Sequence, residues 1–164
     1  NPAGRLPITV PRSVGHLQSF YNHKPSAFHR GGFYLSSRQP LYYFGYGLSY
    51  TTFDYSNLSL PETMTTKDSL TMTVDIENTG EMDGDEVVLI YINDKVSTVT
   101  TPVRKLVAFK RIHLKRGEQK TLSFTLDNQD FELLDRHMKP VVEPGEFEII
   151  IGDRVKVATV IARK

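Results

Sequence analysis

The feature that most constrains the fold is an alternation of apolar and polar residues that recurs from Asp54 onward. In residues 69–77, one side of an extended chain carries Leu70, Met72, Val74 and Ile76, and the other carries Thr71, Thr73, Asp75 and Glu77. A strand with one buried and one solvated face requires this period of two. The runs stop at Gly, Pro or clustered Asn and Asp, which are turn residues. The pattern therefore predicts consecutive β-strands.

About seven strands are predicted, at the spacing of a β-sandwich. They cover residues 50–60, 69–77, 86–93, 103–114, 119–126, 147–151 and 155–161. Residues 86–93 are apolar on both faces, which favours a central strand, and no segment of this half is convincingly helical. The chain lacks Trp and Cys, and therefore the buried Trp and disulfide of true immunoglobulin domains. We expect an all-β fold, a fibronectin type III-like (immunoglobulin-like) β-sandwich with an irregular amino-terminal extension.

The first 45 residues show little periodicity and are interrupted by five prolines and the Gly31-Gly32 pair. A structureless tract of about 40 residues is uncommon inside a compact domain. We therefore predict two parts. Residues 1–45 are expected to form the tail of a preceding domain and a linker, folded back on the sandwich or free of it, and residues 46–164 the sandwich domain.

Composition excludes several classes of function. Apolar residues make up 39% and charged residues 24% of the chain, close to the averages of globular proteins. The net charge is +1, and the basic run at residues 110–116 alternates with apolar residues, which favours a strand with one wet face over a nucleic-acid surface. No apolar run approaches the ~20 residues of a membrane-spanning helix. Residues 1–5 resemble neither a start nor a signal peptide, so we expect a piece of a longer protein.

Neither a metal site nor a catalytic pair is predicted. His16, His23 and His29 share no helix and have no closely spaced carboxylates, so we expect no zinc and no other cofactor. The carboxylates are expected on polar strand faces or at turns, as solubilising charge. They include Asp75, Glu77, Asp83, Asp85, Glu86, Glu143, Glu146 and Glu148.

An aromatic stretch, PLYYFGYGLSYTTF at residues 40–53, is the remaining candidate site. Its glycines do not form a dinucleotide fingerprint, because Tyr50 stands where the third glycine belongs; they suit positive φ or a close backbone approach. The cluster comprises Tyr42, Tyr43, Phe44, Tyr46 and Tyr50. These rings could stack on sugars or line an interface between two domains, and their position at the junction favours the interface. They should then be more exposed than core residues, or be covered by the amino-terminal tract.

This stretch, with several other motifs in order, resembles the carboxy-terminal part of glycoside hydrolase family 3 enzymes, the β-glucosidases and β-xylosidases. The other motifs are NPAGRLPITVP at residues 1–11, YNHKP at 21–25, NTG at 78–80, GDEVV at 84–88, FKRIHL at 109–114 and EPGEF at 143–147. Tyr43 stands where the family commonly has Pro. The resemblance implies that residues 1–25 are the end of an α/β sandwich domain. Residues 26–45 would connect this domain to a fibronectin type III-like terminal domain, which the rest of the chain would form.

The family's nucleophile motif is absent, and no acid/base residue can be matched. The resemblance therefore implies a non-catalytic structural domain of a β-glucosidase-type exo-acting glycoside hydrolase, whose partners are the catalytic domains of the same chain. A carbohydrate-binding module, with oligosaccharide as partner, and a protein-interaction module are the alternatives. We expect no nucleic-acid or membrane partner. The resemblance suggests a periplasmic or secreted protein.

Overall fold

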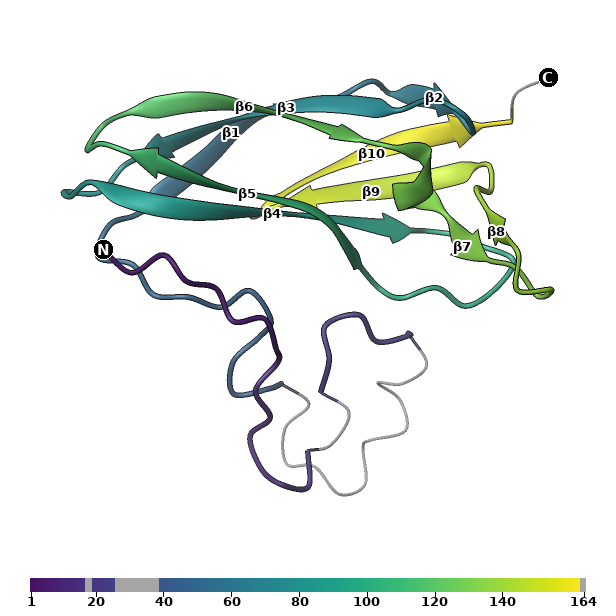
Figure 1. The fold of residues 1–164 in the computed structure, drawn as a ribbon, viewed down its shortest axis with the longest axis horizontal. Coiled ribbons are helices and arrows are strands. Elements are labelled where there is room, and N and C mark those ends of the chain that lie inside the picture. The colour runs from purple at the N-terminus through teal and green to yellow at the C-terminus, as the bar shows by residue number, and fades with distance from the viewer. Residues whose placement is uncertain (17–18, 26–38, 163–164) are drawn as a thin grey trace.

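Two β-sheets pack face to face in the computed structural model, which describes residues 1–16, 19–25 and 39–162 (Figure 1). One sheet has the strand order β1-β3-β6 and the other β2-β10-β9-β4-β5. The strands of the first sheet are β1 (Phe53–Ser59), β3 (Leu70–Asn78) and β6 (Gln119–Leu126). Those of the second are β2 (Thr63–Thr65), β4 (Gly84–Asp94), β5 (Lys105–Leu114), β9 (Gly145–Ile151) and β10 (Arg154–Ile161). The predicted β-sandwich is confirmed.

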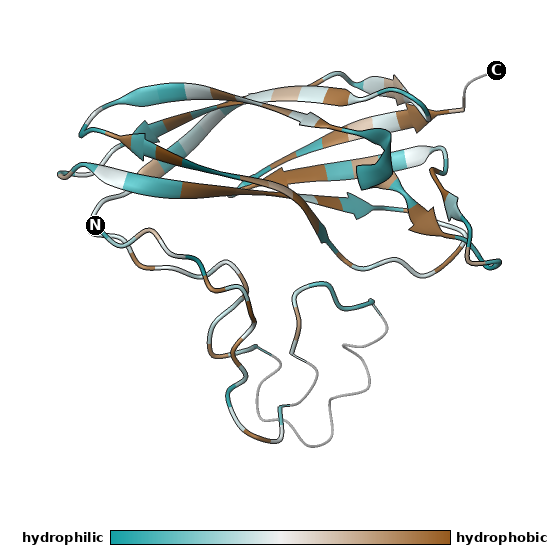
Figure 2. Ribbon diagram, in the orientation of Figure 1, coloured by the Kyte–Doolittle hydropathy of each residue, from teal (hydrophilic) through white to brown (hydrophobic). Residues whose placement is uncertain are grey.

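The alternation along the sequence sets the pairing register, because a slip of one residue would turn the apolar side of a strand to solvent. In the β3–β6 pair, Leu70 lies opposite Leu126 and Met72 opposite Phe124, and all four side chains are buried. Figure 2 shows the alternation as brown and teal bands along the strands. The inward side chains of both sheets form one hydrophobic cluster.

Strand β4 is apolar on both faces, as its sequence predicts, and on the outer face Val87 and Leu89 are half-buried. It lies between β9 and β5. Its inward residues Val88, Ile90 and Ile92 belong to the core, whereas Tyr91 points to the opposite face and is nevertheless buried. Residues of the amino-terminal segment cover this outer face, so the second apolar side of β4 has its own partner.

Each of the seven predicted strands corresponds to a strand of the structure. β1 begins three residues later than the predicted strand 50–60, and β5 begins two residues later than the predicted strand 103–114. The sequence did not reveal β2, the 3₁₀ turn η1 (Asn128–Phe131), or the small ribbon of β7 (Leu133–Leu134) and β8 (Pro140–Val141). These elements have two to four residues, too few for a period to show. None of the described residues lies in a helix long and apolar enough to cross a membrane.

A buried asparagine fixes the turn after β3. The Asn78 side chain is fully buried. Its Oδ1 accepts hydrogen bonds from Thr51 Oγ1 (2.6 Å) and from the Gly80 amide (3.2 Å). Its Nδ2 donates to the carbonyls of Met82 (2.8 Å) and Leu114 (3.1 Å). One side chain therefore ties the entrance of β1, the β3–β4 turn and the end of β5 together.

Replacing this side chain should be costly. Asn78→Ala leaves buried donors and acceptors unpaired, each at a cost of about 1–3 kcal/mol, so we expect the free energy of unfolding in urea to fall by about 3 kcal/mol. Asn22, which is exposed, provides the control, and Asn22→Ala should change stability by less than about 0.5 kcal/mol. A loss below about 1 kcal/mol for Asn78→Ala would contradict the structural role of this residue.

Candidate functional site at the aromatic junction

Residues 1–10 run antiparallel to residues 41–46, which contain four of the five residues of the aromatic cluster. The Leu6 amide donates to the Tyr46 carbonyl and the Gly45 amide to the Leu6 carbonyl, both at 2.8 Å. Four residues further, the Val10 amide donates to the Tyr42 carbonyl, also at 2.8 Å. We call residues 1–10 and 41–46 the amino-terminal ribbon. The ribbon spans the boundary predicted between residues 45 and 46, and Figure 1 shows its chain leaving the sandwich beside β4.

Ring stacking attaches the amino-terminal segment to the outer face of β4. Phe44 stacks on Tyr21 with ring centroids 4.2 Å apart and planes at 27°. Tyr21 in turn meets Tyr91 of β4 edge to face, at 5.9 Å and 65°. Beside them, the guanidinium of Arg104 lies 5.5 Å from the centre of the Tyr91 ring. Aromatic pairs of this geometry add about 0.5–1.5 kcal/mol each beyond the area that they bury.

The four tyrosines predicted for the site are exposed. Tyr42, Tyr43 and Tyr46 are 40–47% exposed, and Tyr42 and Tyr46 lie close, with centroids 4.8 Å apart. Tyr50 is 74% exposed and set apart, and its amide donates to Asn1 Oδ1 at 2.7 Å. Phe44 is half-buried beneath Tyr21. The expectation that this cluster lies outside the β core is confirmed, whereas its role as interface or sugar contact stays a prediction.

Two glycines of the aromatic stretch allow its backbone to lie close to neighbouring residues. Gly45 has a φ of +80°, and a Cβ there would lie 2.8 Å from Leu89 Cδ1. At Gly47 a Cβ would lie 2.5 Å from the Gly4 carbonyl oxygen and 2.9 Å from Arg5 Cδ. Gly45 thus lets the ribbon reach β4, and Gly47 lets the chain pass close to the Gly4 carbonyl and the Arg5 side chain.

Glu86 corrects a prediction. The sequence placed it among solubilising carboxylates, yet it is only 5% exposed. Its two carboxylate oxygens accept hydrogen bonds from Arg5 Nη2 at 2.6 and 2.5 Å, and one of them also accepts from the Tyr55 hydroxyl at 2.7 Å. Burial above all, and then the Glu86 charge, raises the pKa of the Tyr55 hydroxyl. Glu86 is inward because it shares the parity of Val88 and Ile90 on β4.

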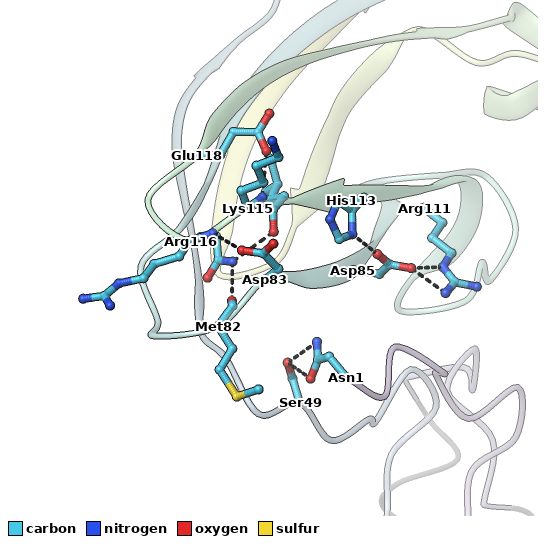
Figure 3. A network of polar contacts seen from close by, with 12 residues as sticks. Asn1, Ser49, Met82, Asp83, Asp85, Arg111, His113, Lys115, Arg116 and Glu118 are labelled. Atoms are coloured by element: carbon cyan, nitrogen blue, oxygen red, sulfur yellow. Dashed lines mark hydrogen bonds and ion pairs between the residues drawn. The ribbon is translucent and has the colours of Figure 1, made fainter.

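Asp85, the neighbour of Glu86, points to the opposite face and joins a polar network (Figure 3). Its carboxylate contacts His113 Nδ1 at 2.6 Å and accepts hydrogen bonds from Arg111 Nε at 2.9 Å and Nη2 at 2.5 Å. The bond with His113, and then that from Arg111, lowers the pKa of the Asp85 carboxyl. In the same network the Asn1 side chain bonds to Ser49.

Three glutamates near β9 have a more specific role than solubility. Glu143 accepts hydrogen bonds from the amide and hydroxyl of Thr98. Glu146 pairs with Lys95 at 3.0 Å, and Glu148 accepts from the Asn93 side chain at 2.9 Å. They fasten the end of β4 and the connection from β4 to β5, which the sequence could not show because the partners lie 45 or more residues away.

A cavity of about 490 Å³ lies between this connection and η1. The charged residues of its lining are Lys24, Asp94, Lys105, Asp130 and Glu132. The buried Asp94 Oδ2 has no hydrogen-bond partner among the described residues, and burial raises the pKa of this carboxyl. The sequence did not single out this cavity.

Metal binding finds no support among the described residues, where no three His, Asp or Glu side chains are placed to hold an ion. His16 is buried and His23 is half-buried. His29 lies outside the described residues.

Gly47→Ala should loosen the ribbon. A methyl group at this position meets backbone and the Arg5 stem, and such overpacking costs about 1–3 kcal/mol. The measurement is the urea unfolding free energy. Gly15→Ala serves as the matched control, since among the described residues a Cβ there would have one neighbour, Ser13 Oγ at 4.0 Å. Equal changes in the two variants would show that the close approach at Gly47 has no energetic weight.

Asp85→Asn should flatten the acid dependence of stability. A carboxyl whose pKa is lowered in the folded state stabilises it above the unfolded value of about 3.9, and this contribution disappears as the pH falls through the folded pKa. We therefore expect the wild type to have the higher urea midpoint at pH 6, with the difference shrinking below about pH 4. A difference that stays constant from about pH 6 to 2 would contradict the ion pairing of Asp85.

Comparison with known proteins gives the family. The fibronectin type III-like domain family matches residues 86–155. The periplasmic β-glucosidase of Salmonella typhimurium is 39% identical over 163 residues, which cover 93% of this chain and 21% of that protein. A β-xylosidase of Formosa agariphila is 41% identical over 155 residues, again covering 93% of this chain and 21% of the relative. The chain thus spans about a fifth of the length of these relatives.

Solved structures of β-glucosidases are similar to this chain as well. A β-glucosidase from Erythrobacter marinus superposes with a TM-score of 0.90 at 34% identity, covering 97% of this chain and 22% of that one. A β-glucosidase from Listeria innocua, in complex with glucose, gives 0.87 at 30% identity, covering 96% and 24%. The chain therefore belongs to the fibronectin type III-like domain family, in the form found in the carboxy-terminal region of glycoside hydrolase family 3 β-glucosidases and β-xylosidases.

Proposed function

We propose that the chain is the non-catalytic, structural part of a β-glucosidase-type exo-acting glycoside hydrolase, and that it packs on the catalytic domains of the same protein. The observation that carries this proposal is an exposed apolar surface on one side of the molecule. It consists of the tyrosines of the ribbon and of the outer face of the five-stranded sheet. Because the relatives are about five times longer than this chain, the rest of the parent protein is the natural partner for it.

The sheet part of this surface follows from the register. Val155 of β10 lies opposite Ile150 of β9, which lies opposite Tyr91 of β4. Tyr91 is covered by Tyr21, but Val155 stays exposed, and so does Phe109 of β5, at 71%. The amino-terminal segment thus covers only the middle of an apolar face. Large apolar patches on a soluble domain are typical of interaction surfaces.

The proposal includes the division of the chain into two parts between residues 45 and 46. Residues 1–45 are the end of a preceding α/β domain and a connecting segment, and residues 46–164 are the sandwich. Backbone hydrogen bonds then join the two parts in addition to chain connectivity, from the Leu6 amide to the Tyr46 carbonyl and from the Val103 amide to the His23 carbonyl. Catalytic carboxylates are assigned to the preceding domains, and the chain alone should not cleave an aryl β-glucoside.

The interface role can be tested in the full-length protein. We expect the triple variant Tyr42→Ser, Tyr46→Ser and Val155→Ser to lower the melting temperature of the full-length enzyme by several degrees, at about 1 kcal/mol or more per lost apolar contact. The isolated chain should change much less, because these side chains are exposed in it. Thr71→Ser and Thr125→Ser on the opposite, polar sheet face form the control.

Equal losses in the isolated chain and in the full-length enzyme would contradict the interface. A melting temperature of the full-length enzyme that does not change would contradict it as well. If the surface is an interface between domains and not a sugar contact, the remaining folded enzyme should keep its turnover number.

Carbohydrate binding is the second candidate, because the exposed Tyr42, Tyr43 and Tyr46 rings could stack on sugars. Retention of the chain on insoluble cellulose or xylan, lost in Tyr42→Ala with Tyr46→Ala, would support it. Retention lost only in Asp94→Asn would instead assign binding to the cavity beside η1. If the chain is not retained at all, this candidate fails.

The name of the Salmonella typhimurium relative, a periplasmic β-glucosidase, supports a periplasmic or secreted location for the parent protein. Fractionation of cells that make the full-length protein tests it, and recovery in the cytoplasmic fraction would contradict it.

A further inference from the structure

The sandwich holds the guanidinium group of Arg5 through Glu86, and the two partners lie in separate sequence motifs, NPAGRLPITVP at residues 1–11 and GDEVV at residues 84–88. Arg5 of the ribbon reaches Glu86 on β4 over a separation of 81 residues, with Nη2 at 2.6 and 2.5 Å from the two carboxylate oxygens. Tyr55 of β1 donates its hydroxyl to the same carboxylate at 2.7 Å. The group therefore bridges the ribbon and both sheets.

We propose that Glu86 and Tyr55 form a guanidinium-binding site of the sandwich. Arg5 is the ligand of this site, and its binding holds the amino-terminal ribbon against the domain. This inference concerns the folding of the chain itself and is independent of the activity of any larger protein. It predicts that the position of the ribbon is controlled by one ion pair.

Burial makes the site selective for a cation. The side chain of Glu86 is 7% exposed, whereas that of Arg5 is 27% exposed. Removing Arg5 would leave a buried carboxylate that, among the described residues, accepts a hydrogen bond from the Tyr55 hydroxyl alone. An unpaired buried charge is strongly destabilising. Removing the Glu86 charge instead would leave Arg5 in partial contact with water, where it can be hydrated. The two single changes should therefore differ in cost.

Shape supports the assignment as well. The Arg5 stem passes Gly47, where a Cβ would come within 2.9 Å of Arg5 Cδ and 3.2 Å of Nη1. The space beside Gly47 therefore fits an arginine side chain, which is partly exposed to solvent there. Both contacts come from one guanidinium nitrogen, Nη2, and a guanidinium is more weakly hydrated than the ammonium of a lysine, which favours it in a buried ion pair. Since the cation side is partly open, a small guanidinium should enter once the side chain is gone.

The first test is a mutant cycle in the whole chain, read from the urea unfolding equilibrium. We expect Arg5→Ala to raise the unfolding equilibrium constant by about 100-fold, and Arg5→Lys by clearly less. Glu86→Gln should destabilise the wild type, yet stabilise the Arg5→Ala variant by about tenfold, because it neutralises the unpaired charge. This reversal of sign identifies a buried charge that needs its cation. Arg12→Ala is the control, since Arg12 is exposed on the same segment.

The second test is chemical rescue, which a merely structural arginine would not show. Methylguanidinium at about 30 mM should restore the stability of Arg5→Ala by about fourfold in the unfolding constant if its dissociation constant is on the order of 10 mM. Methylammonium at the same concentration should restore less. The Arg5→Ala, Glu86→Gln double variant should not respond to methylguanidinium.

Three results would overturn the proposal: a cost of Arg5→Ala equal to that of Arg12→Ala, a destabilising effect of Glu86→Gln in both backgrounds, or rescue that persists in the double variant. If Arg5→Ala does not fold, Arg5→Met, which keeps an apolar stem but carries no charge, replaces it in the cycle and the same signs are expected.

Discussion

Strand β4 carries apolar side chains on both of its faces, and the rest of the structure depends on this constraint. Its inward side chains Val88, Ile90 and Ile92 complete the core between the sheets. Its outward Tyr91 is covered by Tyr21 and lies against the Phe44 stack. A sandwich alone cannot satisfy the second face, because a β-sandwich has only one core. The amino-terminal ribbon is therefore part of the packing of the domain, although it precedes the strands in sequence.

Steric fit, ring stacking and one ion pair hold the ribbon on the domain. Gly45 and Gly47 let its backbone approach β4 and let the Arg5 stem pass. The stacked rings bury apolar area, and the Arg5–Glu86 pair fixes the position. Buried ion pairs add little net stability but are costly to break. A surface held in this way presents its exposed tyrosines in a defined arrangement, as an interface between domains would need.

The sequence predicted the sandwich well and the site only in part. Strands such as β3 and β6 show a period of two, because a half-buried strand must alternate. β2, β7 and β8 could not be predicted, since two or three residues carry no period. Alternation also assigns Glu86 to a face without telling whether that face is covered there, and its partner Arg5 lies 81 residues away. The exposure of Tyr42 and Tyr46 followed from their place at the junction.

Native-state hydrogen exchange of the wild-type chain tests most directly whether the ribbon and the sandwich form one unit. The amides of Leu6, Val10 and Gly45 donate hydrogen bonds within the ribbon, and that of Val74 lies in the core strand β3. If the account is right, the ribbon amides are protected at least about 100-fold and open together, as one cooperative unit. If they exchange at the rate of an unfolded chain while Val74 stays protected, the ribbon is not docked, and the account is wrong.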